Sequence, residues 1–430
     1  MSGKAAWLFL QGPSSPLFMK IADRLEAAGH ACFRINLHAG DQVFWRRHGA
    51  IAYRGRPENW GAFIREVIRS RKIGGLVLLG EERAYHAEAI RAAREAGASA
   101  FVVEMGYLRP DWVTIERDGM SSNSHFPNDP AAILEAARDL PEPDWTRLYR
   151  QTFLAEALYD LAYNLPSVFL GFLYPFYHRH ALFHPLAEYA GWIAQLATEK
   201  RRHARAVAQT AALKASGAPW FVYPLQLQTD FQLRAHSPYN GQPQAIAEVL
   251  SSFAAHAPRD ARLAIKVHPL DNGLIGWARQ IMARAQRLGV GERVHYLGGG
   301  DLGALIDGCS GIVTVNSTAA LHGLRDGIPA KVLGAAIYDI AGMTDQKPLD
   351  AFWQAPERPD PALTSAFYRL LAVSIQVRGN FYSDAGTTAA ADAIAGRLLA
   401  GTVNQPGGDS RAPPRRKPEK YPPDRFMVPD

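Results

Sequence analysis

The alternation of short apolar runs with helix-periodic segments constrains this chain most. Near the N-terminus, "AAWLFLQG" is followed by "SPLFMKIADRLEAAG", whose apolar residues recur at helical spacing, and then by a second apolar run, "HACFRIN". The same order recurs in "IGGLVLLG", "EERAYHAEAIRAAREAG" and "ASAFVVEMG". Apolar strands separated by helices are typical of a parallel sheet that is covered on both faces. The first part of the chain is therefore predicted to be an α/β domain.

A second alternating set starts at "PWFVYPLQLQ" and continues through "ARLAIKVHP" to "GIVTVNSTAALHGLRDGIPAKVLG". We predict an N-terminal Rossmann-like domain at 1–215, with a helical region at about 129–215, and a C-terminal Rossmann-like domain at 216–400. Residues 401–430 are predicted to be a basic, proline-rich, disordered tail. A chain of 430 residues is long enough for two domains. Two such domains facing a central cleft form the GT-B arrangement of many sugar-nucleotide glycosyltransferases.

Composition restricts the classes of protein that remain. The longest apolar stretch, "PSVFLGFLYPFY", is interrupted by Pro175 and is shorter than a membrane span, and the N-terminus lacks a signal-peptide core, so we expect a cytoplasmic protein. Cys32 and Cys309 lie far apart in apolar segments and are expected to be free thiols. The net charge of +6 permits an anionic partner, but no nucleic-acid-binding signature accompanies it, so nucleic acid is not expected.

Two strand ends in the second domain carry residues suited to a phosphate. "KVHP" delivers Lys266 and His268 at the end of an apolar strand, and "TVNSTAALHGL" runs from a strand into a helix with Ser317 or Thr318 at the N-cap. Because the carboxyl ends of parallel strands meet at one edge, these groups are expected to converge on a monophosphate. Ordinary helix capping is the alternative for the Ser-Thr step. The match of "GGGDLG" to a dinucleotide fingerprint is discounted, because the helix after it is too short.

Carboxylates follow two other strands. Glu104 lies at the end of a first-domain strand in "VVEMGYLRPDW", and Asp230 follows the first strand of the second domain in "YPLQLQTDFQL". Each is predicted to lie at the edge of the cleft, where the two would meet. Taken singly, each is more typical of a solvated or hydrogen-bonded loop acid than of a catalytic group.

Seven ordered motifs then give the chain a recognisable pattern. They are "WLFLQGP", "RINLHAGDQVFW", "EMGYLRPDWVTIERDGMSSNS", "YHRHALFHPLAEYAGW", "YPLQLQTDFQLRAHSPY", "KVHPLDNG" and "TVNSTAALHGLRDGIPAKVLGAAIYDIAGMTDQ". In this order they resemble the KpsS/LipB family of capsule polysaccharide synthesis proteins. The resemblance extends from about Trp7 to Tyr382 and leaves only the tail outside it.

The resemblance implies a retaining β-Kdo transferase that uses CMP-β-Kdo, without a cofactor or a metal. The acceptor would be a lysophosphatidylglycerol-type lipid, and the product would be the start of the β-Kdo linker of a capsular polysaccharide. The family implies a peripheral position on the anionic cytoplasmic face of the inner membrane of a Gram-negative bacterium. It also implies functional partners, namely a KpsC-like β-Kdo transferase and an ABC-type capsule exporter.

By the same resemblance, the predicted roles fall on individual residues of this chain. Those implied for the CMP phosphate are Lys266, His268, Pro269, Asn316, Ser317 and Thr318, in a CMP-sugar-binding C-terminal domain. Asp230 is the expected nucleophile and Glu104 the expected acid/base. Related Kdo transferases read "GQVEDD" where this chain reads "LQLQTD", so Gln228 and Thr229 replace two acidic residues. Candidates for the sugar carboxylate or the acceptor are Arg109, Arg234, Gln11, Asn36 and Asp41; for the two arginines, the reason is that a guanidinium binds a carboxylate with two hydrogen bonds.

Other functions remain open on the sequence. One is a non-catalytic component of capsule export that binds a nucleotide sugar or a lipid, and another is a GT-B enzyme that uses a different CMP-sugar, such as CMP-sialic acid. The aromatic and basic segment "LPSVFLGFLYPFYHRHALFHP" is either a lipid-contacting surface or a core helix hairpin with a solvated rim.

Overall fold

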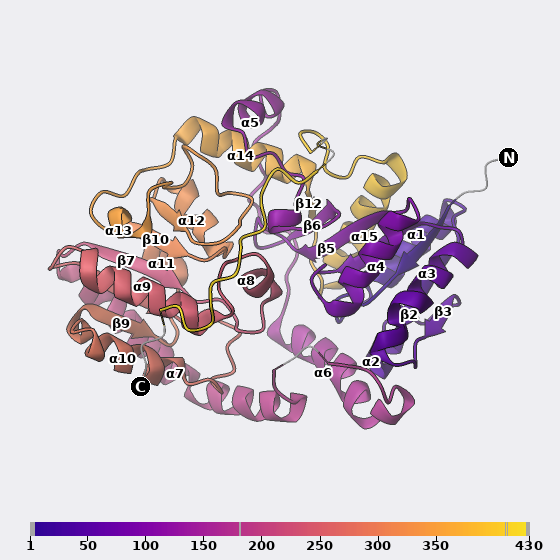
Figure 1. Ribbon diagram of the computed structural model, residues 1–430, viewed down its shortest axis with the longest axis horizontal. Helices are drawn as coiled ribbons and strands as arrows, with labels where there is room; N and C mark the ends of the chain where they lie inside the picture. The colour runs from indigo at the N-terminus through magenta and orange to yellow at the C-terminus, as the bar shows by residue number, and fades with distance from the viewer. Residues whose placement is uncertain (1–4, 180–181, 409, 411, 427–430) are drawn as a thin grey trace. The chain divides into compact units, whose positions relative to one another are not determined.

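The computed structural model describes residues 5–179, 182–408, 410 and 412–426, which form two compact units. Unit 1 comprises Met1–Pro127, Ala136–His180 and Tyr368–Pro414, and unit 2 comprises Asn128–Glu135, Ala181–Phe367 and Arg415–Asp430. Each unit is built on one sheet with helices on both of its faces (Figure 1). The predicted α/β class with two parallel-sheet domains is therefore confirmed.

Unit 1 contains a seven-stranded sheet in the order β12-β6-β5-β4-β1-β2-β3. The five strands from β5 to β3 are parallel, whereas β6 and β12 extend the sheet by antiparallel pairing. The strands are β1 (Ala6–Phe9), β2 (Cys32–Asn36), β3 (Ala50–Ala52), β4 (Ile73–Leu79), β5 (Ser99–Met105), β6 (Trp112–Arg117) and β12 (Gln376–Arg378). All four residues of β1 are buried, as its unbroken apolar run predicts.

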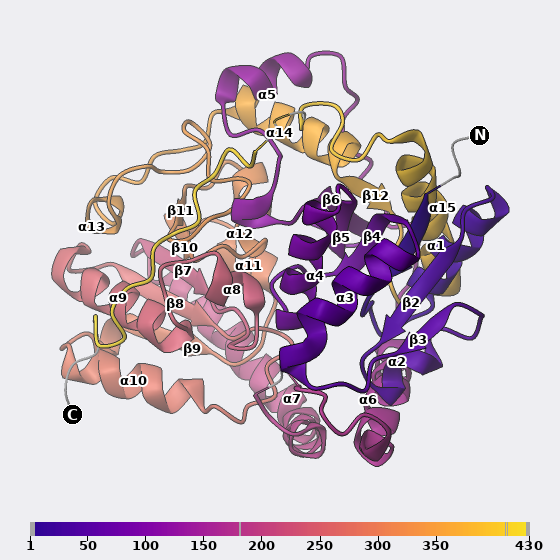
Figure 2. The same ribbon diagram turned by 45° about the vertical axis from the view of Figure 1, so that its right-hand side comes forward.

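Helices cover both faces of this sheet (Figure 2). On one face, α1 (Leu17–Ala27) and α15 (Asp384–Ala400) pack on a core that includes Phe9, Val77 and Val103. On the other face lie α3 (Trp60–Ser70) and α4 (Ala84–Glu95). The short helix α2 (Ala39–Val43) follows β2, and α6 (Phe153–Phe169) packs against it.

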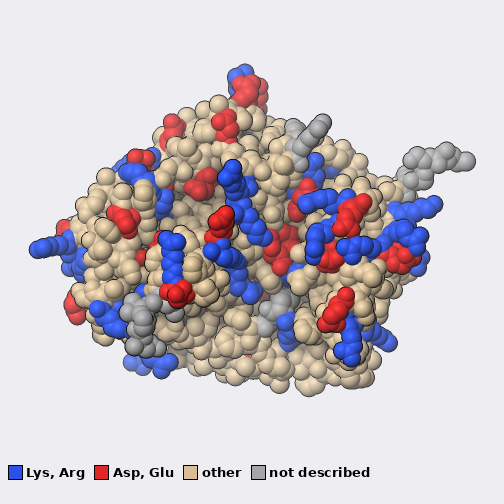
Figure 3. Space-filling view, viewed as in Figure 1, with Lys and Arg blue, Asp and Glu red and all other residues tan. Residues whose placement is uncertain are grey.

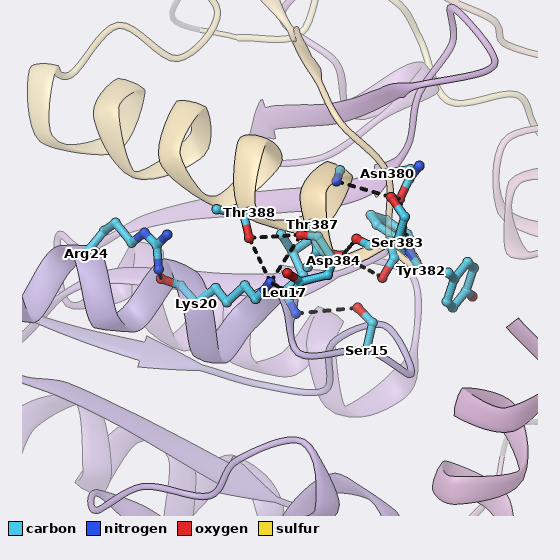
Figure 4. Close-up of polar contacts among 12 residues, drawn as sticks. Ser15, Leu17, Lys20, Arg24, Asn380, Tyr382, Ser383, Asp384, Thr387 and Thr388 are labelled. Atoms are coloured by element: carbon cyan, nitrogen blue, oxygen red, sulfur yellow. Dashed lines mark hydrogen bonds and ion pairs between the residues drawn. The ribbon is translucent and has the colours of Figure 1, made fainter. Parts of the chain in front are cut away.

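The last part of the chain returns to unit 1. The predicted domain boundaries did not anticipate this return. Residues 216–400 were assigned to the C-terminal domain, yet β12 pairs with β6, and α15 packs along α1. Lys20 binds the Asp384 carboxylate at 2.6 Å (Figure 4). Arg24 binds Asp392 at 2.7 Å. The prediction assumed that each domain is one continuous segment. The alanine-rich face of α15 is instead buried in the core of unit 1.

Unit 2 contains a five-stranded, fully parallel sheet in the order β11-β10-β7-β8-β9. Its strands are β7 (Trp220–Pro224), β8 (Arg262–Lys266), β9 (Val294–Leu297), β10 (Gly311–Thr314) and β11 (Ala330–Val332). The core on one face is formed with α9 (Gln242–His256), α10 (Trp277–Arg287) and α13 (Leu349–Phe352). Its other helices are α5 (Pro130–Ala136), α7 (Pro185–Ala215), α8 (Phe231–Ala235), α11 (Leu302–Ile306) and α12 (Ala319–Arg325). The last residue of α5, Ala136, is assigned to unit 1, and α14 (Pro361–Ser374) continues from unit 2 into unit 1.

The helical region predicted at 129–215 is divided between the units. The helix α6 belongs to unit 1, whereas α7 belongs to unit 2 and lies against β9. The boundary predicted at residue 215 therefore differs from the observed division. Composition indicated helix throughout this region, but it carried no information on which sheet each helix covers.

The proline-rich tail makes defined contacts over its described part, in contrast to the predicted disorder. The Lys420 ammonium donates to the carbonyls of Ser237 at 2.9 Å and Tyr239 at 2.7 Å. The Tyr421 amide donates to the Pro238 carbonyl at 2.8 Å, and its ring packs edge-to-face on Tyr239. Prolines restrict the unfolded chain, so such a segment is ordered at a low entropic cost.

Two smaller expectations concern the cysteines and the charge. Cys32 and Cys309 are buried free thiols, as predicted. On the face drawn in Figure 3, Lys and Arg side chains are interspersed with Asp and Glu.

Candidate functional site

Three neighbouring parallel strands of unit 2 bring predicted site residues to one edge of the sheet. Strand β7 lies between β10 and β8, and all three point the same way. Lys266 is the last residue of β8, Asn316 follows β10 by two residues, and Asp230 lies in the segment after β7. Parallel strands therefore place these side chains at their common carboxyl edge, as the sequence predicted.

Asp230 is held in a hydrogen-bonded network with two of these segments. Its Oδ1 accepts from the Gln232 amide at 2.8 Å as the N-cap of α8, and its Oδ2 accepts from Gln226 Nε2 at 3.3 Å. Gln226 Nε2 also donates to Asn316 Oδ1 at 2.8 Å, and Asn316 Nδ2 donates to the Gln232 carbonyl at 2.8 Å. Gln226 and Asn316 are buried, whereas Asp230 is half-buried. The network orients a carboxylate that remains accessible.

The Ser-Thr step starts the next helix. Thr318 is the N-cap residue of α12, and Ser317 Oγ accepts from the Ala319 amide at 3.2 Å. The Ser317 amide in turn donates to Thr314 Oγ1 at 3.1 Å. The predicted N-cap position is confirmed. Because α12 has seven residues, the field of its dipole is a minor contribution.

Lys266 is a buried cation that faces a cavity. Its side chain is 5% exposed and lines a hollow of about 400 Å³. Among the residues that the structure describes, no group accepts a hydrogen bond from its ammonium. Burial lowers the pKa of Lys266, and the more distant charge of Asp301 only partly opposes this shift. A buried ammonium without a close partner is costly, so the cavity is suited to an anion.

The cavity has walls from four parts of unit 2. From the loop after β8 come His268, Pro269 and Asp271; Tyr296 lies in β9, and Trp277 starts α10. The fourth wall comes from α7 and consists of Trp192, Gln195, Glu199, Arg202 and His203. Sequence analysis missed this wall because it assigned α7 to the first domain. The basic and aromatic residues of "GWIAQLATEKRRH" were the available signal.

Local hydrogen bonds shape the loop that carries His268. The His268 Nδ1 accepts from the Leu270 amide at 3.0 Å. Asp271 then accepts from the Gly273 amide at 2.8 Å and from Trp277 Nε1 at 3.1 Å. His268 is half-buried at the mouth of the cavity. The "HPLD" segment therefore forms a compact turn at the end of β8.

The glycine run that was discounted as a dinucleotide fingerprint has a packing role. Gly298, Gly299 and Gly300 line the same cavity, and Gly300 has φ +79°. A Cβ at Gly300 would lie 3.0 Å from the Cβ of Ala206 in α7. Small residues here allow α7 to approach the end of β9 closely enough to close the cavity.

The predicted phosphate residues form two groups within this edge. Lys266, His268 and Pro269 line the cavity, whereas residues 316–318 are not among its described lining and belong to the Asp230 network. Arg234, a candidate for the sugar carboxylate, donates to the Thr229 carbonyl at 3.2 Å and lies 4.6 Å from the centre of the Phe231 ring. It therefore braces the segment that carries Asp230.

In unit 1, Glu104 lies near the end of β5. Its side chain is half-buried, and Oε1 accepts from the Met105 amide at 3.0 Å. Burial, together with the negative charges of Glu156, Asp160 and Glu104, raises the pKa of Tyr382 to about 12, although a hydrogen bond with Ser14 opposes this shift. The Tyr382 hydroxyl is therefore protonated at neutral pH.

A second cavity, of about 280 Å³, begins at the residue after Glu104. Arg109 lines it and donates from Nε to the Gly106 carbonyl at 3.2 Å. Its remaining lining includes Met105, Trp112, Arg147, Phe153, Glu156, Phe381 and Tyr382. Arg109 thus belongs to the same unit as the candidate acid, although Glu104 is not among the described lining of this cavity.

The other candidates of unit 1 belong to a buried cluster. Asp41 is 0% exposed and accepts from the Leu37 amide at 2.8 Å and from the Tyr163 hydroxyl at 3.1 Å; it also pairs with Arg34 at 3.4 Å. Gln11 Nε2 donates to Asp41 at 3.4 Å. Burial would raise the pKa of Asp41, but His38, Arg34 and these donors lower it below its usual value. Asp41 is held as a carboxylate.

Asn36 ends β2 in the same region and is fully buried. Neither its Oδ1 nor its Nδ2 has a hydrogen-bond partner among the described residues. Gln11 and Asp41 are thus hydrogen-bonded to each other. Asn36 is buried and lies close to Asp41 in the sequence. The roles predicted for these three residues stay predictions.

Glu104 belongs to unit 1 and Asp230 to unit 2, and each is described here within its own unit. The prediction that the two acids meet over one pocket stays a prediction. Glu104 is the last residue but one of β5, and Asp230 lies in the segment after β7.

Comparison with known proteins adds independent findings. The family model described as "Capsule polysaccharide biosynthesis protein" matches residues 75–382. The chain is 32% identical over 386 residues to the capsule polysaccharide export protein KpsS of Escherichia coli, covering 89% of this chain and 98% of that protein. It is also 32% identical over 386 residues to the capsule polysaccharide modification protein LipB of Neisseria meningitidis serogroup A, covering 87% of this chain and 91% of the relative.

Among solved structures, the chain matches the β-Kdo 2,7 transferase of KpsC from Thermosulfurimonas dismutans. The TM-score is 0.45 at 12% identity, covering 90% of this chain and 97% of that one. In the described part of the chain, the search for apolar helices of membrane-spanning length found none.

Proposed function

Because this chain belongs to the capsule polysaccharide biosynthesis protein family, we propose that it is a retaining glycosyltransferase that moves Kdo from CMP-β-Kdo to a lysophosphatidylglycerol-type lipid. The product would start the β-Kdo linker of a capsular polysaccharide. Membership of this family supports a role in capsule assembly, which the sequence motifs had also indicated. The donor, the acceptor and the stereochemistry are the proposal.

The main support for a donor that contains phosphate is one observation. The buried Lys266 ammonium lines a cavity at strand ends of unit 2. A monophosphate ester would supply a counter-charge that no described residue provides within ion-pair distance of this lysine. His268 at the mouth of the cavity is positioned to donate a hydrogen bond to the leaving phosphate, and Trp192 and Trp277 provide flat apolar walls for a base or sugar ring. The cavity therefore fits the nucleotide half of a CMP-sugar.

The chemistry proceeds by two inversions at C2 of Kdo. An Asp230 oxygen attacks C2 as the C2–O bond to CMP breaks, and CMP leaves with the bonding electrons and its negative charge. The acceptor hydroxyl then attacks C2, its proton passes to Glu104, and the bond to Asp230 breaks to restore the carboxylate. The hydrogen bonds from Gln232 and Gln226 orient the Asp230 carboxylate for the first step. This route places no step on a metal.

The acceptor and the location follow from the same proposal. A lipid acceptor requires the protein to work at the cytoplasmic face of the inner membrane, as a peripheral protein. The chain would then hand its product to a KpsC-like transferase, upstream of an ABC-type capsule exporter. A basic chain with a net charge of +6 is compatible with an anionic membrane surface.

The decisive experiment has a covalent and a kinetic arm. The full chain is incubated with CMP-Kdo alone and analysed by intact-protein and peptide mass spectrometry. A Kdo adduct on the peptide that contains Asp230, absent in Asp230→Ala, supports the proposal. An adduct that persists in Asp230→Ala eliminates this residue as the nucleophile.

The kinetic arm measures CMP release with a lysophosphatidylglycerol acceptor. We expect release with CMP-Kdo and none with CMP-sialic acid. Turnover with CMP-sialic acid in place of CMP-Kdo would identify a transferase with another donor. Binding of CMP-Kdo with neither release nor an adduct would identify a non-catalytic binding protein.

A further inference from the structure

The outer face of α6 in unit 1 carries an unbroken apolar stripe. Leu154, Leu158, Leu161, Leu165 and Phe169 follow the i, i+4, i+7, i+11, i+15 spacing of one helix face. At 1.5 Å per residue the stripe is about 22 Å long. No residue of the helix is buried, and Leu154, Leu158 and Phe169 are exposed. We define these five residues as the α6 stripe.

The opposite face of α6 attaches the helix to unit 1. The rings of Tyr159 and Tyr163 lie 5.8 Å and 6.2 Å from that of Phe44. The Tyr163 hydroxyl donates to the buried Asp41 carboxylate at 3.1 Å. The polar and aromatic contacts thus hold the helix through one face and leave the apolar stripe on the other. This orientation is the reverse of that expected for a helix that packs a core.

The charges of α6 lie off the stripe. Its only charged residues are Glu156, which lines the cavity of unit 1, and Asp160, whose carboxylate accepts from Asn164 at 3.0 Å. No charged side chain therefore interrupts the stripe. Apolar side chains continue past its end in Leu170 and Phe172, and Phe172 is 73% exposed.

Exposed cations precede the stripe. Arg147 and Arg150 are exposed just before the helix. At the other end, Arg179 donates to Ser167 at 3.0 Å, but Ser167 lies on the face opposite the stripe, so this arginine belongs to the face that packs on unit 1. An apolar stripe that follows two exposed arginines is complementary to an anionic bilayer, in which acyl chains lie beneath phosphate head groups.

We propose that the α6 stripe is the surface by which this protein docks on an anionic lipid bilayer. The stripe enters the boundary between head groups and acyl chains, and the two preceding arginines bind phosphates. The inference rests on the proposed function, because a lipid acceptor gives the protein a reason to dock. It adds that docking is built into unit 1, whose second cavity is lined by Phe153 at the start of the same helix.

Vesicle flotation of the full chain tests this assignment. We expect the protein to float with phosphatidylcholine vesicles that contain phosphatidylglycerol, and less with pure phosphatidylcholine. The double variant Leu154→Glu, Leu158→Glu should lower the vesicle-bound to free ratio at least 10-fold. Arg147→Ala with Arg150→Ala should remove most of the dependence on phosphatidylglycerol. Leu399→Glu, which changes an exposed leucine elsewhere in unit 1, should float like the wild type.

Three results would overturn the assignment. The first is that the wild-type protein floats with neither kind of vesicle, and the second is that the double variant floats at the wild-type level. The third is that the wild type forms a dimer and the double variant does not, because a second copy of the chain would then cover the stripe. Donor turnover is measured in parallel with a short-chain, water-soluble acceptor. A double variant that no longer floats but still releases CMP separates docking from catalysis. Loss of CMP release in the wild type with intact flotation would contradict the proposed function alone.

Discussion

In each unit a buried charged side chain lies close to the end of a strand, but the surroundings of these two side chains differ. Asp41 in unit 1 is fully buried and receives hydrogen bonds from the Leu37 amide and the Tyr163 hydroxyl, with Arg34 as its counter-ion. Lys266 in unit 2 is 5% exposed and faces a cavity of about 400 Å³, and the negative charge of Asp301 only partly opposes the effect of its burial. A satisfied buried charge indicates a structural role, and an unsatisfied one beside a cavity indicates a ligand site.

If the proposed function holds, the chemistry is expected near Lys266 rather than near Asp41. Asp230, on the same sheet edge as Lys266, is half-buried and oriented by Gln226. Substitutions of Asp41 should therefore affect stability, whereas those of Lys266 and Asp230 should affect ligand binding and turnover. The predictions below test this division from the largest expected effect to the smallest.

The largest effect is expected for Asp230→Asn. Asparagine keeps an oxygen for the Gln232 amide but is a poor nucleophile, so turnover should fall about 10⁴-fold or more, about 5.5 kcal/mol in activation free energy. The rate of CMP release measures this, and circular dichroism checks the fold. Asp360→Asn, at the start of α14, is the matched control because Asp360 also accepts a hydrogen bond from the backbone, from the Ala362 amide at 2.7 Å. Equal activity of Asp230→Asn and wild type would remove Asp230 from the mechanism.

Asp41→Ala should produce the largest loss of stability. The substitution leaves Arg34, which is 1% exposed, without its counter-ion, and we expect the free energy of unfolding to fall by about 3–5 kcal/mol. Urea unfolding followed by circular dichroism gives this value. Asp384→Ala, which removes an exposed ion pair with Lys20, should cause a far smaller change. Similar losses in both variants would contradict the structural role of Asp41.

Lys266→Met should have two effects of opposite sign. Loss of a charged hydrogen bond to phosphate should weaken CMP binding roughly 10- to 100-fold, as measured by calorimetry. The same change removes a buried, unpaired charge and should raise the melting temperature of the ligand-free protein. Because burial lowers the pKa of Lys266, CMP binding to the wild type should weaken as pH rises through that lowered pKa. A variant with lower stability and unchanged CMP affinity would make Lys266 structural, like Asp41.

The smallest effect concerns the pH dependence of unit 1. His86 is fully buried on α4, where burial and the charge of Arg83 lower its pKa to about 3. The unfolded chain binds a proton at this histidine below about pH 6.5 and the folded chain does not, so stability is lost as pH falls from 6.5 toward 3. The difference in slope between wild type and His86→Gln should be about 1.4 kcal/mol per pH unit in urea unfolding. Parallel pH profiles would show that His86 is charged in the folded protein.

Much of the local structure and several candidate sites could be predicted from the sequence. The apolar runs became strands and the periodic segments became helices, because burial on both faces of a parallel sheet requires these patterns. Thr318 took the predicted N-cap position, and Lys266 ended its strand before Pro269. The seven motifs also identified the family. Such features depend on residues that are close together in the chain.

The rest depends on contacts between distant segments. Only the tertiary structure decided that α15 completes unit 1 against α1, and that α7 forms a wall of the Lys266 cavity with Trp192 and Arg202. It also decided that Asp41 is enclosed by Tyr163, more than a hundred residues away, while the apolar stripe of α6 is left outside. A periodic sequence specifies which face of a helix is apolar. Which surface covers that face is decided by the free energy of packing in the folded chain.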